Sequence, residues 1–235
     1  MSEGWDTSAA AWIASLDQDF SRHGVLDGPM LSRVRAGGYG RALDVGCGEG
    51  RFCRMMQAEG VASIGVDPTA ELIGVARARD PAGDYRIGRA ERLDFADASF
   101  DLVVSYLSLI DIEGLEAAVA EMARVLRPGG AILVANLTSF NTAGGWRDEP
   151  GQPSRFEMDH YLESRAEWVA WKGIRVRNFH RPLSRYMQAF LAQGLRLTLF
   201  DEPAPAPDWP DQQLAARYRR APWLVLMEWR KDQTG

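Results

Sequence analysis

The sequence predicts one α/β domain built on a mostly parallel sheet with helices on both faces. Between residues 41 and 136, short apolar segments alternate with helical segments, which is typical of strand–helix–strand units. The chain has 235 residues, enough for one such domain with a full core and short for two. Its composition, 46% apolar and 25% charged, is that of an ordinary globular protein.

The first segment, 1–40, is predicted to be a helical extension that precedes the sheet. Apolar residues recur there at helical spacing, at Ala9, Trp12, Ile13 and Leu16. Gly24 and the glycine-rich stretch 37–40 interrupt this pattern. We therefore expect two helical pieces before the first strand.

The segment 41–136 is predicted to form the core of the sheet. Its apolar runs predict strands at 42–45, 62–66, 85–87, 100–105 and 131–136. The segments between them predict helices at 51–59, 70–79 and 115–126. The last of these helices stops at Pro128-Gly129-Gly130, which leads directly into the fifth strand.

The remainder divides into an insertion at 137–181 and a C-terminal part at 182–235. The strand–helix alternation stops in the insertion, which is unusually rich in aromatic residues: Trp146, Phe156, Tyr161, Trp168, Trp171 and Phe179. The C-terminal part predicts a helix at 183–193 and strands at 195–200 and 223–229. A proline-rich stretch, 203–210, separates these two strands and is too long for a tight hairpin.

Composition argues against several classes of protein. The net charge of −5 disfavours a nucleic-acid partner, although the stretch 172–185 is locally basic. Cys47 and Cys53 lack metal-ligand spacing, so we expect two reduced thiols and no metal site. No apolar run approaches the roughly 20 residues that span a bilayer, and the acidic first residues do not resemble a secretory signal. A cytoplasmic protein without a membrane partner is expected.

The most informative stretch is Asp44-Val45-Gly46-Cys47-Gly48-Glu49-Gly50, which links an apolar strand to a helix. Glycines permit backbone conformations and a close ligand approach that a Cβ would block. The helix that follows offers unpaired N–H groups at its start. This geometry suits a nucleotide-like ligand.

The spacing distinguishes between nucleotide-like ligands. Dinucleotide-binding loops use G-x-G-x-x-G to seat a pyrophosphate, whereas this loop is G-x-G-x-G with Asp44 before it. A carboxylate there would repel a pyrophosphate and attract an amine. S-adenosylmethionine has an amine and a sulfonium and no phosphate. In its D-V-G-C-G-x-G form, the loop resembles the signature of class I S-adenosylmethionine-dependent methyltransferases.

Further stretches carry the same resemblance in the same order, at 64–68, 88–95, 99–105 and 124–130. It implies a Rossmann-like, seven-stranded, mostly parallel sheet with S-adenosyl-L-methionine as cofactor. It also implies a set of cofactor-binding residues: Asp44, Gly46, Gly48, Gly50, Arg51, Asp67, Pro68, Ala90, Glu91 and Ser105. Asp67 follows Gly46 by 21 residues, where an acidic side chain accepts the ribose hydroxyls, although it could instead cap the next helix. Many relatives carry an acid at the position of Arg89, so Glu91 or the Ala90 backbone would have to contact the adenine.

The resemblance implies methyl transfer but not the acceptor. No N/D-P-P-Y/F run follows the fourth strand, and no Pro-Cys pair is present, so methylation of nucleic-acid bases is disfavoured. We expect O- or N-methylation of a small molecule. A partner-dependent RNA methyltransferase and a non-catalytic S-adenosylmethionine-binding relative remain as alternatives. The basic stretch is expected to be a solvated face, an anion-binding lip or, least in keeping with the rest of the chain, an RNA contact.

In this family the insertion after the fifth strand commonly forms a substrate lid, which implies that role for 137–181. Its tryptophans, Trp146, Trp168 and Trp171, either wall an acceptor pocket or form a small core of their own. His180 is the candidate general base because histidine titrates near neutral pH. Tyr106, just past the fourth strand, is the second candidate for a direct catalytic role.

Overall fold

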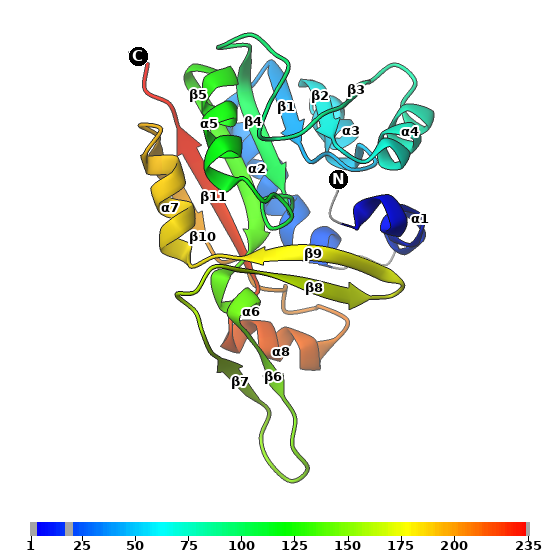
Figure 1. Cartoon of the computed structure of the whole chain (residues 1–235), viewed down its shortest axis with the longest axis vertical. Helices are drawn as coiled ribbons and strands as arrows, with labels where there is room; N and C mark the ends of the chain where they lie inside the picture. Colours follow the sequence, from blue (N-terminus) through cyan, green and yellow to red (C-terminus); the bar gives the residue numbers. More distant parts are fainter. Residues whose placement is uncertain (1–3, 17–20, 234–235) are drawn as a thin grey trace.

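The computed structural model describes residues 4–16 and 21–233 and confirms the predicted fold class (Figure 1). A seven-stranded sheet has the order β10-β11-β5-β4-β1-β2-β3, in which only β11 runs antiparallel to its neighbours. Its strands, in chain order, are β1 (Arg41–Val45), β2 (Ala62–Asp67), β3 (Asp84–Ile87), β4 (Phe100–Tyr106), β5 (Leu126–Leu137), β10 (Arg196–Asp201) and β11 (Leu224–Arg230).

The helices between the strands also agree closely with the predicted segments. They are α3 (Arg51–Ala58), α4 (Ala70–Arg79), α5 (Leu115–Val125) and α7 (Leu183–Leu191). The predicted N-terminal extension forms α1 (Trp5–Ser15), a π-helical turn η2 (Arg22–Leu26) and α2 (Asp27–Gly37). Helices on both faces explain why the central strands are almost uninterrupted apolar runs.

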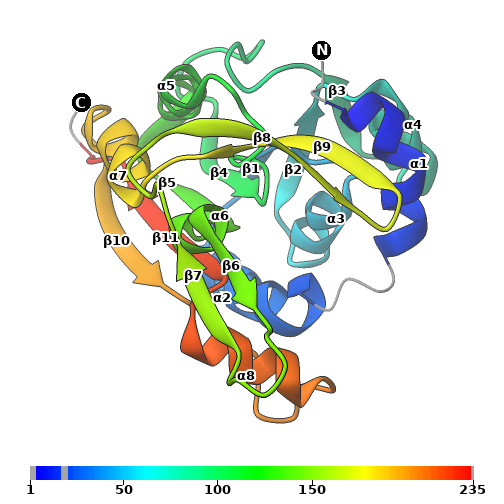
Figure 2. The same ribbon diagram turned by 60° about the horizontal axis from the view of Figure 1, so that its bottom comes forward.

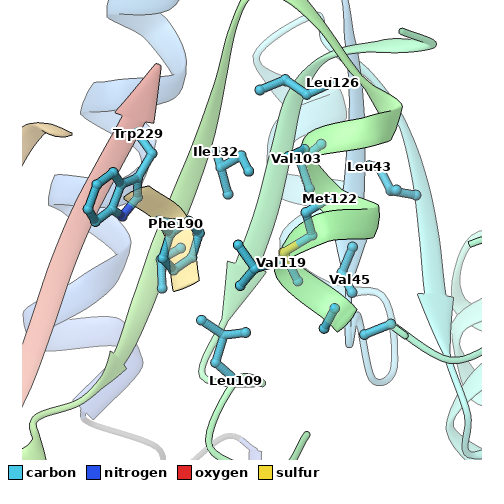
Figure 3. Packing of buried hydrophobic residues seen from close by; sticks show 14 of the residues in the cluster. Leu43, Val45, Val103, Leu109, Val119, Met122, Leu126, Ile132, Phe190 and Trp229 are labelled. Carbon is cyan, nitrogen blue, oxygen red and sulfur yellow. The ribbon is translucent and has the colours of Figure 1, made fainter. Parts of the chain in front are cut away.

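Alternate side chains of the central strands point to opposite faces of the sheet and pack into two hydrophobic cores. On one face, β1, β4 and β5 pack against α5 and α7, as the close view in Figure 3 shows for Leu43, Val103, Ile132 and Val119. Phe190 of α7 and Trp229 of β11 stack there with ring centroids 4.9 Å apart. On the other face, the strands pack against α2 and α3. Both layers are therefore sealed by helices on either side of the sheet.

Two elements differ from the expectation. Strand β5 begins at Leu126, directly after α5, so Pro128-Gly129-Gly130 lies within an irregular start of the strand. The sequence interpretation placed these residues between helix and strand. A further helix, α8 (Gln212–Arg220), lies in the long connection before β11 and was not predicted. Asp211 caps it by accepting a hydrogen bond from the N–H of Leu214.

The insertion forms a short helix and two hairpins. These are α6 (Ser139–Ala143), then β6 (Gly144–Arg147) with β7 (Arg155–Met158), then β8 (Arg165–Trp171) with β9 (Ile174–His180). Hairpin β8–β9 crosses the end of the sheet toward α1, whereas β6–β7 projects beside α8 (Figures 1 and 2). Ser8 of α1 fixes the first contact, because its hydroxyl exchanges hydrogen bonds of 3.0 Å with the backbone of Arg175.

The strand order reverses between β1 and β4, so the loops that follow these strands separate and leave a crevice. Loops after β1, β2 and β4 all meet at this edge, and α1 and hairpin β8–β9 lie beside it (Figure 2). Within the described ranges, no helix is long and apolar enough to cross a membrane.

Candidate active site

Each glycine of the loop after β1 has a positive φ, of 78° at Gly46, 55° at Gly48 and 78° at Gly50. A Cβ on Gly46 would lie 2.3 Å from the Cβ of Ser108, and one on Gly50 would lie 2.5 Å from the Tyr85 ring. A Cβ on Gly48 would meet no protein atom within 4 Å. Gly46 and Gly50 are thus needed for packing, while Gly48 leaves room for a ligand.

Asp67, at the end of β2, holds this loop in place. Its Oδ2 accepts a hydrogen bond of 3.0 Å from the N–H of Gly48, and its Oδ1 accepts one of 2.8 Å from the N–H of Thr69. The carboxylate oxygens keep further lone pairs for ribose hydroxyls. The bond to Thr69 ties Asp67 to the start of α4, and the ribose contact stays a prediction.

The loop borders an open pocket of about 1060 Å³ at the crevice. Nine of the predicted site residues line it: Asp44, Gly46, Gly48, Arg51, Asp67, Pro68, Ala90, Glu91 and Tyr106. Three others, Gly50, Ser105 and His180, do not line it. The structure thus brings most of the predicted cofactor-binding set together around one cavity.

Asp44 is the unusual group of this pocket. Its carboxylate is almost fully buried, and its Oδ1 has no hydrogen-bond partner among the described residues. Its Oδ2 accepts only a weak bond of 3.6 Å from the Cys53 thiol. Burial raises the pKa of Asp44 to about 7. A buried carboxylate with one oxygen left without a partner fits the positively charged amine of S-adenosylmethionine and would oppose a pyrophosphate.

The opposite end of the pocket holds the residues predicted for adenine. Ala90 is buried there, so its backbone is what a ligand would meet. Glu91 Oε1 accepts hydrogen bonds from the Gly114 N–H at 3.4 Å and from the Arg89 guanidinium at 3.3 Å. Arg89 also lines the pocket, beside the Glu91 carboxylate, and whether Glu91 or the Ala90 backbone contacts the adenine stays a prediction.

Ser105 lies beneath the pocket and does not line it, whereas Ser108 does. Strand β4 continues to Tyr106, and Leu107 then turns the chain with a φ of 57°. Ser108 therefore folds back over Ser105, with their hydroxyl oxygens 2.7 Å apart, and donates a 2.6 Å hydrogen bond to the carbonyl of Val45. The prediction missed Ser108 because a left-handed turn at a leucine has no sequence signal.

The N-terminal extension contributes a residue that sequence reasoning did not foresee. Asp27 Oδ1 accepts a 2.8 Å hydrogen bond from the Tyr106 hydroxyl, and the Asp27 carboxylate also pairs with Arg51. Burial and the adjacent Asp27 raise the pKa of Tyr106 well above its usual range. Tyr106 consequently stays protonated at neutral pH and cannot serve as a base, although its ring lines the pocket.

His180 lines neither this pocket nor a second one beside it. Its Nδ1 lies 2.6 Å from the Thr142 hydroxyl, and its Nε2 lies 2.8 Å from the carbonyl of Tyr161, to which it donates. Burial lowers its pKa. Since both ring nitrogens are occupied in joining β9 to the rest of the insertion, we do not retain His180 as the base.

A second pocket, of about 1390 Å³, adjoins the first. The two share five lining residues, which are Trp5, Trp12, Arg22, Leu107 and Asp111. Beyond these, hairpin β8–β9 and the segment before β11 supply further walls: Val169, Trp171, Lys172, Asn178, Trp209 and Trp223. Such an apolar cavity with a few polar groups is typical of a small-molecule site.

Only one of the three tryptophans singled out in the insertion lines this second pocket, namely Trp171. Trp146 packs on Phe156 and under two arginines of α8, and Trp168 lies half exposed under Arg175, whose guanidinium is 4.2 Å from the ring centre. Trp171 therefore lines a pocket, Trp146 packs within the insertion and against α8, and Trp168 belongs to neither arrangement. Trp5 and Trp12 were missed as site residues because helical spacing alone does not say what a helix covers.

Two arginines of the basic stretch are engaged within the molecule, whereas Lys172 and Arg175 are exposed. Arg181 is buried and donates to the carbonyls of Leu109, Ile112 and Glu113. Arg185 pairs with Glu116. The Arg181 contacts hold the loop after β4, and the Arg185 pair joins α7 to α5.

Comparison with known proteins agrees with this site. Residues 43–134 match the model of a methyltransferase domain. The chain is 36% identical over 189 residues to a demethylmenaquinone methyltransferase of Renibacterium salmoninarum, covering 80% of this chain and 66% of that protein. It is 32% identical over 140 residues to a malonyl-[acyl-carrier protein] O-methyltransferase of Enterobacter lignolyticus, covering 57% and 56%.

Solved structures match more of the chain. An S-adenosylmethionine-dependent methyltransferase from Mesorhizobium loti gives a TM-score of 0.75 at 25% identity, covering 85% of this chain and 96% of that one. A structure from Listeria monocytogenes gives 0.76 at 22% identity, covering 86% and 96%, and supports the fold. The chain belongs to the class I S-adenosylmethionine-dependent methyltransferases. The matched part of the chain spans about half of the O-methyltransferase from Enterobacter, covering 56% of its length.

Proposed function

We propose that this protein transfers a methyl group from S-adenosylmethionine to a small-molecule acceptor held in the second, tryptophan-lined pocket. The observation that carries the proposal is the pair of adjoining pockets. One contains the glycine loop and Asp44, whose Oδ1 has no partner among the described residues, and the other is apolar and shares five residues with it. A methyl donor and its acceptor must meet in line, which requires two adjacent sites.

Several residues have roles that follow from their positions. Asp44 would hold the amine of the cofactor, Asp67 its ribose, and the Gly48 backbone would lie against its methionine part. When bound, S-adenosylmethionine supplies a methyl group activated by a positive sulfonium. Trp5 and Trp12 lie between the pockets and would exclude water from the transfer.

The alternatives receive less support. An RNA acceptor needs a basic face, and Arg181 and Arg185 of the basic stretch are engaged within the chain. A non-catalytic relative would not need a second cavity that opens beside the cofactor site. Similar proteins named a malonyl-[acyl-carrier protein] O-methyltransferase and a ubiquinone biosynthesis O-methyltransferase support O-methylation without specifying an acceptor.

The test is calorimetric binding of S-adenosylhomocysteine, the demethylated cofactor, to wild type and to Gly48→Ala. Because a Cβ at Gly48 would enter the cavity, we expect micromolar binding by wild type, roughly −8 kcal/mol, and a loss of at least about 1.4 kcal/mol in the variant. Gly60→Ala is the matched control, since Gly60 also has a positive φ and open surroundings but lines neither pocket. Tighter binding of NADH, or equal binding by all three proteins, would contradict the assignment.

A further inference from the structure

We propose that Asp111 is the catalytic base and that the acceptor is an aromatic compound methylated on a hydroxyl group. This inference rests on the proposed function and goes further, because it assigns both a catalytic residue and a substrate class. Asp111 is the only carboxylate among the described residues that lines both pockets. A group at that junction can reach the acceptor atom that faces the methyl donor.

The surroundings of Asp111 fix its carboxylate. Asn178 of β9 donates a 2.5 Å hydrogen bond to Oδ1, and the side chain of Trp5 donates another. The N–H of Asp111 donates to the Ser108 carbonyl at 3.0 Å, which closes a turn. Positioning from three separate segments is what an aligned base requires.

The loop that carries Asp111 is itself immobilised by β9. The N–H of Phe179 donates to the carbonyl of Ile110 at 2.8 Å. Arg181 donates to the carbonyls of Leu109 at 3.2 Å and of Ile112 at 2.5 Å. Backbone hydrogen bonds on both sides of Asp111 thus hold the loop in place, and the Asp111 side chain lines the cavity.

The protonation state of Asp111 suits a base at neutral pH. Burial raises its pKa to about 7, the nearby Asp67 raises it further, and the hydrogen bonds from Trp5 and Asn178 together with the charge of Arg22 oppose this shift. A carboxylate with a raised pKa is a stronger proton acceptor than an exposed one. It is ionised in a useful fraction of molecules near pH 7.

The walls of the second pocket indicate the substrate class. Five indoles, those of Trp5, Trp12, Trp171, Trp209 and Trp223, offer flat apolar surfaces suited to a planar ring. The charged groups among the described lining residues are Arg22, Lys172 and Asp111, so cations outnumber the one carboxylate. A cationic amine would be repelled by them, whereas a neutral hydroxyl or its anion would not.

The step is balanced without a further reactant. Asp111 takes the hydroxyl proton while the oxygen forms the bond to the methyl carbon, and the carbon–sulfur bond breaks with its electron pair left on sulfur. The protonated Asp111 then releases its proton to solvent. Arg22, over the ring of Trp12 at 4.4 Å, adds a positive charge near the developing oxyanion.

Three naphthalene probes of similar shape test the inference: 2-naphthol, 2-naphthylmethylamine and 2-naphthoate. Binding is measured by calorimetry on protein saturated with S-adenosylhomocysteine, and transfer is measured with methyl-labelled S-adenosylmethionine. We expect 2-naphthol to bind about tenfold more tightly than the amine and to be the probe that is labelled. Tighter binding or labelling of the amine or the naphthoate would overturn the substrate class.

Asp111→Asn keeps the side-chain shape and the bond from Asn178 but removes the base. We expect it to bind S-adenosylhomocysteine as wild type does, to transfer methyl groups roughly 10²–10⁴-fold more slowly, and to lose the rise in rate through pH 7. Asn178→Ala should lower the rate less and shift that rise. Asp97→Asn, which changes an exposed carboxylate that lines neither pocket, is the control.

The outcomes separate the two proposals. Failure of wild type to bind S-adenosylhomocysteine would overturn the proposed function itself. Normal binding of S-adenosylhomocysteine, combined with no binding or labelling of 2-naphthol, would overturn only the aromatic hydroxyl acceptor. A wild-type rate in Asp111→Asn would overturn Asp111 as the base.

Discussion

A buried carboxylate oxygen without a hydrogen-bond partner, such as Oδ1 of Asp44, destabilises the empty protein. Local folding does not need it, because the turn at Gly46 is already fixed by the bond from its N–H to the Val66 carbonyl. In our proposal, the amine of the cofactor offsets this cost when it binds to Asp44. At the scale of single residues, the site is therefore prepared for its ligand at the expense of stability.

The raised pKa of Asp44 predicts a pH dependence of cofactor binding. Its pKa of about 7 in the empty protein means that the carboxyl is largely protonated below pH 7 and must release a proton to bind an amine. The affinity for S-adenosylhomocysteine should thus fall about tenfold per pH unit as the pH drops below 7.

Calorimetry at pH values between about 5.5 and 8, which bracket the pKa of about 7, checks this expectation. Asp44→Asn should bind more weakly at pH 8 by about 1.5–3 kcal/mol and should show little dependence on pH. Asp111→Asn, which alters the other pocket carboxyl with a pKa of about 7, should retain the dependence. A flat profile in wild type would refute the role of Asp44.

At the scale of elements, the insertion is not one unit. Hairpin β8–β9 supplies walls of the acceptor pocket and carries Asn178. Hairpin β6–β7 lines neither pocket and is held to α8, because Arg217 bonds to Asp148 and Arg220 to the carbonyl of Ser154. The expected lid of 137–181 is thereby narrowed in our proposal to its second hairpin.

Hydrogen exchange should separate the two hairpins. When S-adenosylhomocysteine and 2-naphthol bind together, amides of β8–β9 should exchange more slowly, because the ligands add contacts to Trp171 and order the strands. Amides of β6–β7 should be unaffected and serve as the internal control. Equal protection of both hairpins would indicate that the whole insertion closes as a lid, and no change in either would make it a rigid structural part.

At the scale of the whole molecule, we expect stability to depend on the packing of helix α7 against strand β11 of the sheet. Phe190 of α7 is fully buried against Trp229 of β11, with the rings inclined by only 7°. Phe190→Ala should lower the free energy of unfolding by about 3–5 kcal/mol, measured by urea denaturation. Leu191→Ala, next to it but 55% exposed, should change it by less than about 0.5 kcal/mol. Similar losses in both variants would show that the stack is not the source of the effect.

Much of the fold could be predicted because its signals are local. The periodicity of 41–136 marks strands and helices, and the glycine spacing around Gly48 reflects backbone conformations that few other residues adopt. Asp27 and Asp111 had no such signal. Their importance depends on contacts with Tyr106 and Asn178, which lie far away in the chain. Single histidines mislead for the same reason, since only tertiary contacts decide whether an imidazole is buried or free.

The origin of the pocket walls has an evolutionary consequence. The walls of the second pocket, which we propose holds the acceptor, come largely from the N-terminal helices, hairpin β8–β9 and the segment around Trp209, whereas the matched family domain ends at residue 134. Selection can therefore alter the acceptor by replacing flanking segments, while the glycine loop and Asp67 stay intact. Junctions near residues 40 and 137 are where recombination between relatives would exchange specificity and preserve the shared donor.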